Sequence, residues 1–190
     1  EITDFIPPPS EDFNLENPQD LLQYGQQELW KGNYSQALSS FKILLDRIKD
    51  DKNSDPKDIV ELMQQSGQIY RTQCQFKEAA GILEEAYNLK KSSDSLKNDE
   101  ELEISLLNDI SRLHIELAQY PEAEEKLIGL KYLQENNRKK TLAHARTYKN
   151  LAILYDKFAK EAEGLTMINK YFEIQFEFLP ENHIDLSERY

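Results

Sequence analysis

The sequence has little of what disulfide-bonded, metal-binding and strand-rich proteins need. Its one cysteine, Cys74, excludes a disulfide within the chain and a cysteine-based metal cluster. Six glycines and seven prolines in 190 residues are few for a fold rich in tight turns, which disfavours an all-β protein. No apolar run approaches the roughly 20 residues of a membrane-spanning helix. These absences favour a helical protein, placed in the cytoplasm by default. A secreted, processed chain stays open because the sequence starts at Glu1.

Basic residues are also in short supply. Lysine and arginine total 23 against 35 aspartates and glutamates, which gives a formal net charge of -12. Such a surface repels phosphate backbones and anionic lipid heads, so the charge argues against nucleic acid and against membrane insertion. A protein or peptide partner is favoured instead.

What the sequence does contain is a repeat. Two small residues twelve positions apart occur four times, and the second of each pair recurs about every 42 residues. Large apolar residues recur in step with these pairs, four positions before the first small residue and four positions after the second. Residues three and four positions apart share one face of a helix. The pattern therefore predicts that each unit forms two amphipathic helices, which cross closely at the small residues. The pairs are Gly25 and Ala37, Gly67 and Ala79, Ser111 and Ala123, and Ala152 and Gly164.

Helix ends are marked as well. Asn17-Pro18 and Asp55-Pro56 each place a capping side chain before a proline that suits the first helical turn. Short breaks separate the two helices of each unit, and Cys74 stands in one of them where other units have Gly32 or Ala118. We therefore interpret Cys74 as a small buried residue of a turn and not as a reactive thiol.

Four stretches of the chain resemble the tetratricopeptide repeat family: LLQYGQQELWKGNYSQALSSF, LMQQSGQIYRTQCQFKEAAGIL, LLNDISRLHIELAQYPEAEEKL and TYKNLAILYDKFAKEAEGLTMI. The long period, the segment YKNLAILY and the ending FEIQFEFLPENHIDLSERY resemble the kinesin-light-chain type of this family. The resemblance implies an all-α fold, a right-handed α-α superhelix of about four helix pairs plus the start of a fifth. The fourth unit departs most, with Gly164 in place of alanine and Glu161 in place of an aromatic residue.

The predicted organisation is a leader followed by the repeat array. Residues 1–17 hold three consecutive prolines and form an extended leader, either an unpaired tail or a lid that packs Phe5 or Phe13 on the first repeat. The array covers residues 18–190. Its repeats span approximately 18–51, 56–92, 100–136 and 141–179, and 183–190 start a further helix. An uncovered last repeat leaves self-association through the C-terminal repeat open.

Residue patterns for catalysis are missing. His114 stands at a repeat position held elsewhere by Tyr70 and Tyr155, which indicates packing, and His144 and His183 have no ligand partner at metal spacing. The sequence has no glycine loop for phosphate and no nucleophile elbow. It therefore predicts no enzyme, no cofactor and no metal.

The resemblance places the binding surface on the first helices of successive units, which line a concave groove in the family. Side-chain amides there can pair with the backbone of an extended peptide, because an amide both donates and accepts. Arg112, Arg146 and Lys149 make the third and fourth units locally basic, which suits an acidic segment. The family's basic clamp for a terminal carboxylate is absent, since its places in the first two units carry Leu22, Gln26 and Gln65. The predicted groove residues are Gln23, Gln26, Gln65, Gln68, Asn108, Asp109, Arg112, Arg146, Lys149 and Asn150.

Two functions fit this interpretation. The first is a protein-protein interaction scaffold that binds a peptide segment or partner protein in the groove. The alternative is a peptide-sensing receptor module that controls an output domain outside this chain, as in bacterial pheromone receptors with similar arrays.

Overall fold

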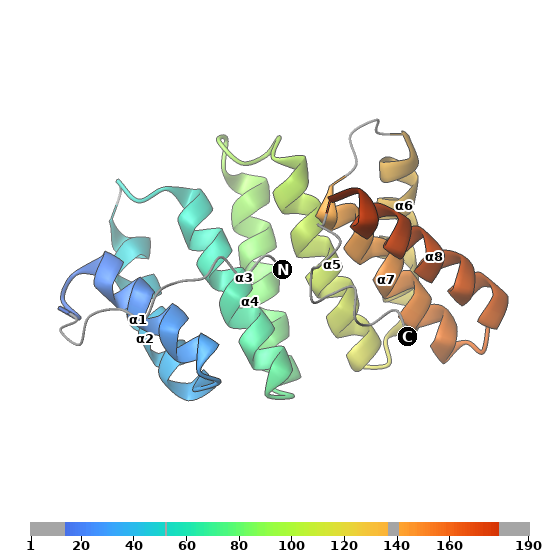
Figure 1. Ribbon diagram of the computed structural model, residues 1–190. Coiled ribbons are helices and arrows are strands. Elements are labelled where there is room, and N and C mark those ends of the chain that lie inside the picture. Colours follow the sequence, from blue (N-terminus) through green and yellow to red (C-terminus); the bar gives the residue numbers. More distant parts are fainter. Residues whose placement is uncertain (1–13, 52, 137–140, 179–190) are drawn as a thin grey trace. The chain divides into compact units, whose positions relative to one another are not determined.

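The computed structural model describes residues 14–51, 53–136 and 141–178, and these residues form eight α-helices and no strand (Figure 1). The predictions for residues 1–13 of the leader and for a further helix at 183–190 lie outside the described residues. Contacts divide the chain into two compact units, Glu1–Lys97 and Asn98–Tyr190. The helices are α1 Pro18–Trp30, α2 Tyr34–Asp50, α3 Pro56–Thr72, α4 Phe76–Ser92, α5 Glu100–Glu116, α6 Tyr120–Asn136, α7 Leu142–Lys157 and α8 Glu161–Phe178.

The two predicted helix starts are confirmed. The side-chain oxygen of Asn17 accepts the backbone N–H of Gln19 at 2.9 Å, with Pro18 in the first helical position. Asp55 does the same for Lys57 at 2.9 Å. Each cap satisfies a backbone donor that has no partner within the helix. The sequence signals therefore fix where α1 and α3 begin.

Unit 1 is built on close helix crossings at the predicted small residues. In this unit α1 packs on α2, α2 on α3, and α3 on α4 (Figure 1). A Cβ atom added to Gly25 would lie 2.5 Å from the Phe41 ring, and one added to Gly67 would lie 2.7 Å from Leu83. Ala37 on α2, the partner of Gly25, is fully buried. Small residues are needed here because a larger one would occupy the space of a core side chain.

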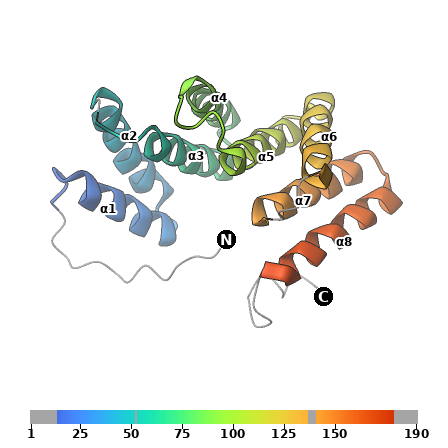
Figure 2. The ribbon, with the colours of Figure 1, turned by 90° about the horizontal axis from the view of Figure 1, so that it is seen from above.

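Unit 2 follows the same scheme with a looser last crossing. Here α5 and α6 pack as a pair, α7 contacts α5, α6 and α8, and the two ribbon views agree on this arrangement (Figure 2). Ser111 and Ala123 are fully buried at the α5–α6 crossing. By contrast, a Cβ atom at Gly164 would meet its nearest neighbour, the Ala152 carbonyl oxygen, at an ordinary 3.7 Å. The departure of the fourth unit in the sequence thus corresponds to a less tightly packed pair.

The turn within each helix pair contains one residue in the left-handed backbone region. The φ angles are 80° at Gly32, 58° at Cys74, 58° at Ala118 and 54° at Ala159. This conformation ends a first helix and directs the chain into the second. The prediction that Cys74 is buried is wrong, because its side chain is exposed. Its positive φ disfavours β-branched and bulky residues, which is a constraint that burial does not impose.

In the first and third helix pairs, side-chain hydrogen bonds also stabilise the turn. In the first pair, the Asn33 side chain and Lys31 donate to Glu28 at 2.7 Å and 2.9 Å, and together they lower the pKa of the Glu28 carboxyl. In the third pair, His114 Nδ1 lies 2.8 Å from the Gln119 side-chain oxygen. His114 lies in the last turn of α5 and is half-buried, and its ring contacts the residue before α6; the prediction that it is a packing residue stays a prediction.

Candidate binding surface

In unit 1 the predicted groove residues lie on two helices that are not packed on each other. Gln23 and Gln26 belong to α1, whose close backbone contacts among the described helices are with α2 alone. Gln65 and Gln68 belong to α3, which contacts α2 and α4. The side chain of Gln23 is exposed and the other three are half-buried. Unit 1 thus presents amides in two separate pairs.

In unit 2 the structure brings the predicted residues together, because α5 and α7 pack directly. Asn108 on α5 is fully buried. Its side-chain nitrogen donates to the Thr147 hydroxyl at 2.9 Å, to the Ile104 carbonyl at 2.9 Å and to the Ala143 carbonyl at 3.2 Å. Since Ala143 and Thr147 belong to α7, this one amide fastens the two helices.

A second amide returns the contact from α7. Asn150 Nδ2 donates to the backbone oxygen and to the side-chain oxygen of Asn108, each at 3.1 Å. The Thr147 hydroxyl also accepts Gln134 Nε2 from α6 at 2.7 Å. Buried polar groups of this kind are costly unless paired, and a paired network fixes one arrangement of the helices. Asn108 and Asn150 therefore position the α5–α7 face from inside the unit.

An ion pair lies at the edge of this network. The Arg146 guanidinium on α7 donates to the carboxylate of Asp109 on α5. It also donates to the Ser105 hydroxyl at 3.3 Å, one helical turn earlier on α5. The Asp109 side chain is 6% exposed, whereas that of Arg146 is 39% exposed. A buried carboxylate therefore holds an arginine that still reaches solvent.

The other two predicted cations lie on the same two helices. Arg112 Nε donates to Glu116 at 2.8 Å, and its side chain is 29% exposed. The Lys149 ammonium lies 5.3 Å from the centre of the Tyr171 ring on α8. A ring face attracts a cation at this distance. Each of the three basic side chains is therefore held in place by a neighbour within unit 2.

Sequence reasoning missed Ser105 and Thr147. The sequence did not identify them as hydrogen-bond partners of the groove residues, because each contact joins residues about forty positions apart. A signal for Ser105 was available, since it precedes Asp109 by four residues and so shares its helix face.

The described residues offer no sign of metal or acid-base chemistry on this face. Among them, no three His, Cys, Asp or Glu side chains gather as metal ligands. His144 is buried at the start of α7, and burial lowers the pKa of its ring, while Glu101 and Glu100 oppose this in part. No described helix is long and apolar enough to cross a membrane.

Solved structures with similar folds exist, although no protein-family model and no curated protein sequence matches this chain. BtubC (BKLC) from P. vanneervenii superposes with a TM-score of 0.70 at 18% identity, over 90% of this chain and 66% of BtubC. The TPR-like repeats of a putative kinesin light chain from Podosopora anserina superpose at 14% identity, over 84% of this chain and 75% of theirs. Two crystal structures of those repeats give TM-scores of 0.63 and 0.60. This chain therefore has an all-α, tetratricopeptide-like repeat fold like that of the kinesin-light-chain repeats.

Proposed function

We propose that the chain is a protein-interaction scaffold whose unit 2 binds an extended peptide across α5 and α7. A carboxylate of the peptide binds at Arg146. Unit 1 by itself presents the amides of Gln23, Gln26, Gln65 and Gln68, which we propose as a second surface for backbone contacts that depend little on peptide sequence. The single observation that supports this proposal best is the arginine held by Asp109 and Ser105.

The held guanidinium has the properties of a recognition group. An arginine carries five N–H donors in a fixed fork, and the contacts with Asp109 and Ser105 leave others for a ligand. Because those contacts already fix the Arg146 side chain, this side chain loses little additional conformational entropy when a ligand binds. Lysine in this place would be a single point charge without the fork geometry. Arg146 is thus suited to a carboxylate or to a peptide carbonyl.

Local charge favours an acidic segment only moderately. The groups described above, the cations Arg112, Arg146 and Lys149 and the carboxylates Asp109 and Glu116, sum to 3 − 2 = +1, whereas all of α5 and α7 together holds four cations and six carboxylates, 4 − 6 = −2. The chain as a whole carries -12. An acidic peptide would therefore be repelled at a distance and attracted at this face alone, which favours specificity over affinity.

The proposal includes neither catalysis nor nucleic-acid binding. The overall negative charge opposes nucleic acid. The exposed thiol of Cys74 suits a reducing compartment, which supports the cytoplasm as the location.

A peptide selection tests this function. Random dodecapeptides displayed on phage are selected on the whole chain, and the winning sequences are synthesised and titrated by calorimetry. We expect enrichment of Asp or Glu, and binding weakened at least about tenfold by Arg146→Gln, as for loss of a hydrogen bond to a charged group. Lys126→Gln removes the same charge from α6 and should change binding less than about twofold.

Arg146→Gln also leaves the buried Asp109 carboxylate without its ion-pair partner. The double variant Arg146→Gln with Asp109→Asn removes this buried charge. Helix content and thermal midpoint are measured for every variant. Selected peptides without acidic residues that bind both variants equally would refute the proposed site.

A further inference from the structure

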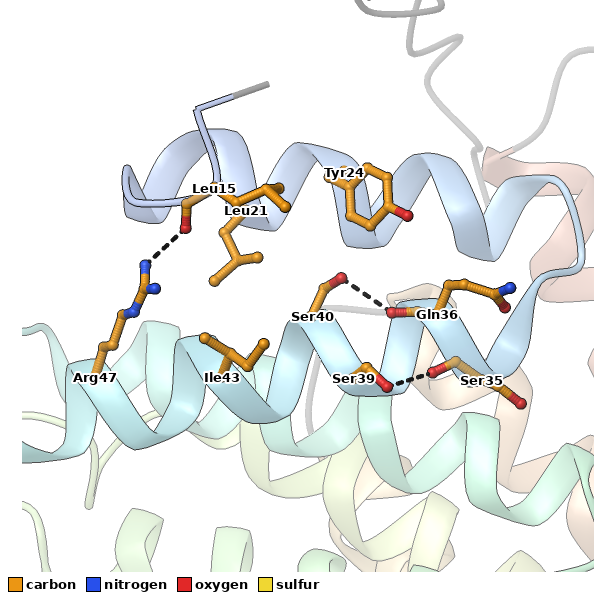
Figure 3. A pocket seen from close by; sticks show the side chains of 9 residues that line it. All are labelled: Leu15, Leu21, Tyr24, Ser35, Gln36, Ser39, Ser40, Ile43 and Arg47. Atoms are coloured by element: carbon orange, nitrogen blue, oxygen red, sulfur yellow. Dashed lines mark hydrogen bonds between the residues drawn. The ribbon is translucent and has the colours of Figure 1, made fainter. Parts of the chain in front are cut away.

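Large apolar side chains reach the surface in both units, but their surroundings differ. In unit 1, Ile43 of α2 lines a cleft of about 350 Å³ together with Leu15 and Leu21, so it has apolar neighbours within its own unit (Figure 3). In unit 2, Ile128 and Tyr132 of α6 are 42% and 70% exposed. Neither belongs to the apolar core that spans α5 to α8 or to the side chains packed on that core. The packing of unit 2 therefore does not explain why these two residues are apolar.

Ile128 and Tyr132 belong to one stripe of side chains on α6. Pro121, Glu125, Ile128 and Tyr132 follow one another at steps of four, three and four residues, so they share one face of the helix. All four are exposed, and the buried residues of α6 lie on the opposite face. We call these four residues the outer stripe.

The second helices of the other three pairs are polar where α6 has Ile128 and Tyr132. The counterparts are Lys42, Glu84 and Asn169 for Ile128, and Asp46, Asn88 and Glu173 for Tyr132. All of these counterparts are exposed. Contacts between neighbouring repeats recur from one repeat to the next, so stacking of the helix pairs does not require an apolar residue at either position. An apolar pair on α6 alone indicates a contact of another kind.

The charge around the outer stripe is negative. Together α6 and α8, the two second helices of unit 2, hold three cations and eight carboxylates, 3 − 8 = −5. Glu125 in the stripe and Glu122, three residues earlier, are exposed and form no ion pair with the described residues. The net charge of -12 attracts a basic partner from a distance and repels a second copy of this chain. Charge complementarity therefore favours a partner rich in lysine or arginine.

The outer stripe offers side chains but no free backbone groups. Because residues 120–136 are helical, the N–H and C=O groups inside α6 bond to one another and cannot pair with an extended peptide. A helical partner satisfies its own backbone and presents side chains every three or four residues, which matches the spacing of the stripe. The Tyr132 ring suits such a contact, because it combines an apolar surface that also attracts cations with a hydroxyl group.

We propose that the outer stripe of α6 binds a basic amphipathic helix of a partner protein. The apolar residues of this helix cover Ile128 and the ring of Tyr132, and its lysines or arginines pair with Glu125 and Glu122. The outer stripe shares no residue with the peptide site at Arg146, and it takes a partner of the opposite charge.

Titration with a designed peptide tests the proposal in the full 190-residue chain. The probe is a synthetic peptide of about 18 residues, or five helical turns, with leucines on one face, lysines elsewhere and a fluorophore at one end. Binding is followed by fluorescence anisotropy. Ile128→Asn with Tyr132→Asn gives α6 the amide residue that α8 and α4 carry at these positions. We expect this double variant to bind the probe at least about tenfold more weakly, because two apolar contacts are lost.

The matched control for apolar surface is Trp30→Asn with Ile43→Asn, which removes two exposed apolar residues from unit 1. This control should change binding less than about twofold, because neither residue belongs to the outer stripe. The conservative variant Ile128→Leu with Tyr132→Phe keeps the apolar contacts and should bind within about threefold of the unmodified chain. Circular dichroism verifies that every variant keeps its helix content.

A second pair of variants tests the charge. Glu122→Gln with Glu125→Gln should weaken binding about fivefold and reduce its dependence on salt, as for the loss of two exposed ion pairs. Glu78→Gln with Glu84→Gln makes the same change in net charge at exposed positions of α4 and should alter binding less than about twofold.

Several outcomes would overturn the proposal. One is equal binding of the probe by the unmodified chain and by Ile128→Asn with Tyr132→Asn. Another is equally tight binding of a leucine-glutamate peptide of the same pattern, or of a leucine-lysine peptide whose scrambled sequence is not amphipathic. Sedimentation velocity covers the remaining occupant. A dimer of the unmodified chain that the double asparagine variant does not form would assign the outer stripe to a second copy.

Discussion

At the scale of single residues, Asn108 has the most connected polar side chain among the predicted groove residues. Its amide joins α5 to α7, and its own oxygen accepts Asn150. Replacing Asn108 with alanine leaves the carbonyls of Ile104 and Ala143 without these donors in a closed interior. We expect Asn108→Ala to lower the free energy of unfolding by about 1–3 kcal/mol in a urea titration.

Asn88 on α4 provides the control, because its side chain is exposed. Asn88→Ala should change the free energy of unfolding by less than about 0.5 kcal/mol. Similar values for the two variants would mean that the buried amide network contributes nothing beyond helix propensity.

His144 makes stability depend on pH. Its Nδ1 accepts the Thr141 backbone N–H at 3.0 Å, so the neutral ring carries its proton on Nε2. Burial lowers the pKa of this ring below 6.5, so on acidification the unfolded chain takes up the proton first. The contribution of His144 is therefore present above about pH 6.5 and is lost as the pH falls towards the folded-state pKa.

We expect the thermal midpoint to fall between about pH 7 and pH 5.5, and His144→Gln to reduce this dependence, because glutamine can accept a hydrogen bond and does not titrate. The midpoint is followed by circular dichroism in buffers of equal ionic strength. An unchanged pH profile in the variant would assign the effect to other groups.

The failure of sequence reasoning at single residues has a physical cause. Cys74 was predicted to be buried because its repeat counterparts are small, yet it lies in an exposed turn whose positive φ angle disfavours β-branched and bulky residues. Asn108 was predicted to face a ligand because it is polar on a first helix. Its partners Thr147 and Asn150 stand 39 and 42 positions later, and spacing within one helix does not identify them.

At the scale of elements, two glycines allow the effect of backbone conformation on stability to be separated from that of side-chain packing. A Cβ atom at Gly32 or at Gly81 would meet nothing within 4 Å, so packing cannot distinguish the two positions. Gly32 has a φ of 80°, whereas Gly81 lies inside α4. Gly32→Ala should therefore destabilise by about 1 kcal/mol, and Gly81→Ala should stabilise by about 0.5–1 kcal/mol. Chemical denaturation of both variants measures the opposite signs, and equal signs would contradict the left-handed turn.

The helices themselves were predictable from sequence because each signal acts locally. Asn17 and Asp55 cap within two residues, and the phase of small and large residues follows from helix geometry alone. For the candidate site, the sequence predicted only which helices carry the residues and not which side chains contact one another. Which cations gain a fixed geometry depends on the α5–α7 contact, because Arg146 is held by Asp109 and Ser105, which lie on another helix.

At the scale of the whole molecule, the division into Glu1–Lys97 and Asn98–Tyr190 predicts how a local change spreads. In repeat proteins each element contacts its neighbours, so destabilisation decays with distance along the array. Asn108→Ala should raise amide hydrogen exchange in α5–α8, most of all in α5 and α7, and leave α1 and α2 unchanged. Gly25→Ala is the matched change in unit 1, because its new Cβ would lie 2.5 Å from the fully buried Phe41 ring and should cost about 1–3 kcal/mol.

Exchange followed by mass spectrometry of peptic peptides reads both variants at once. We expect two complementary patterns, with faster exchange in α5–α8 for Asn108→Ala and in α1–α4 for Gly25→Ala, because local openings follow the contacts of each unit. If either variant accelerates exchange evenly from α1 to α8, the two units open as a single cooperative structure. In that case a ligand held at Arg146 would slow exchange in every helix, whereas independent units confine its effect to α5–α8.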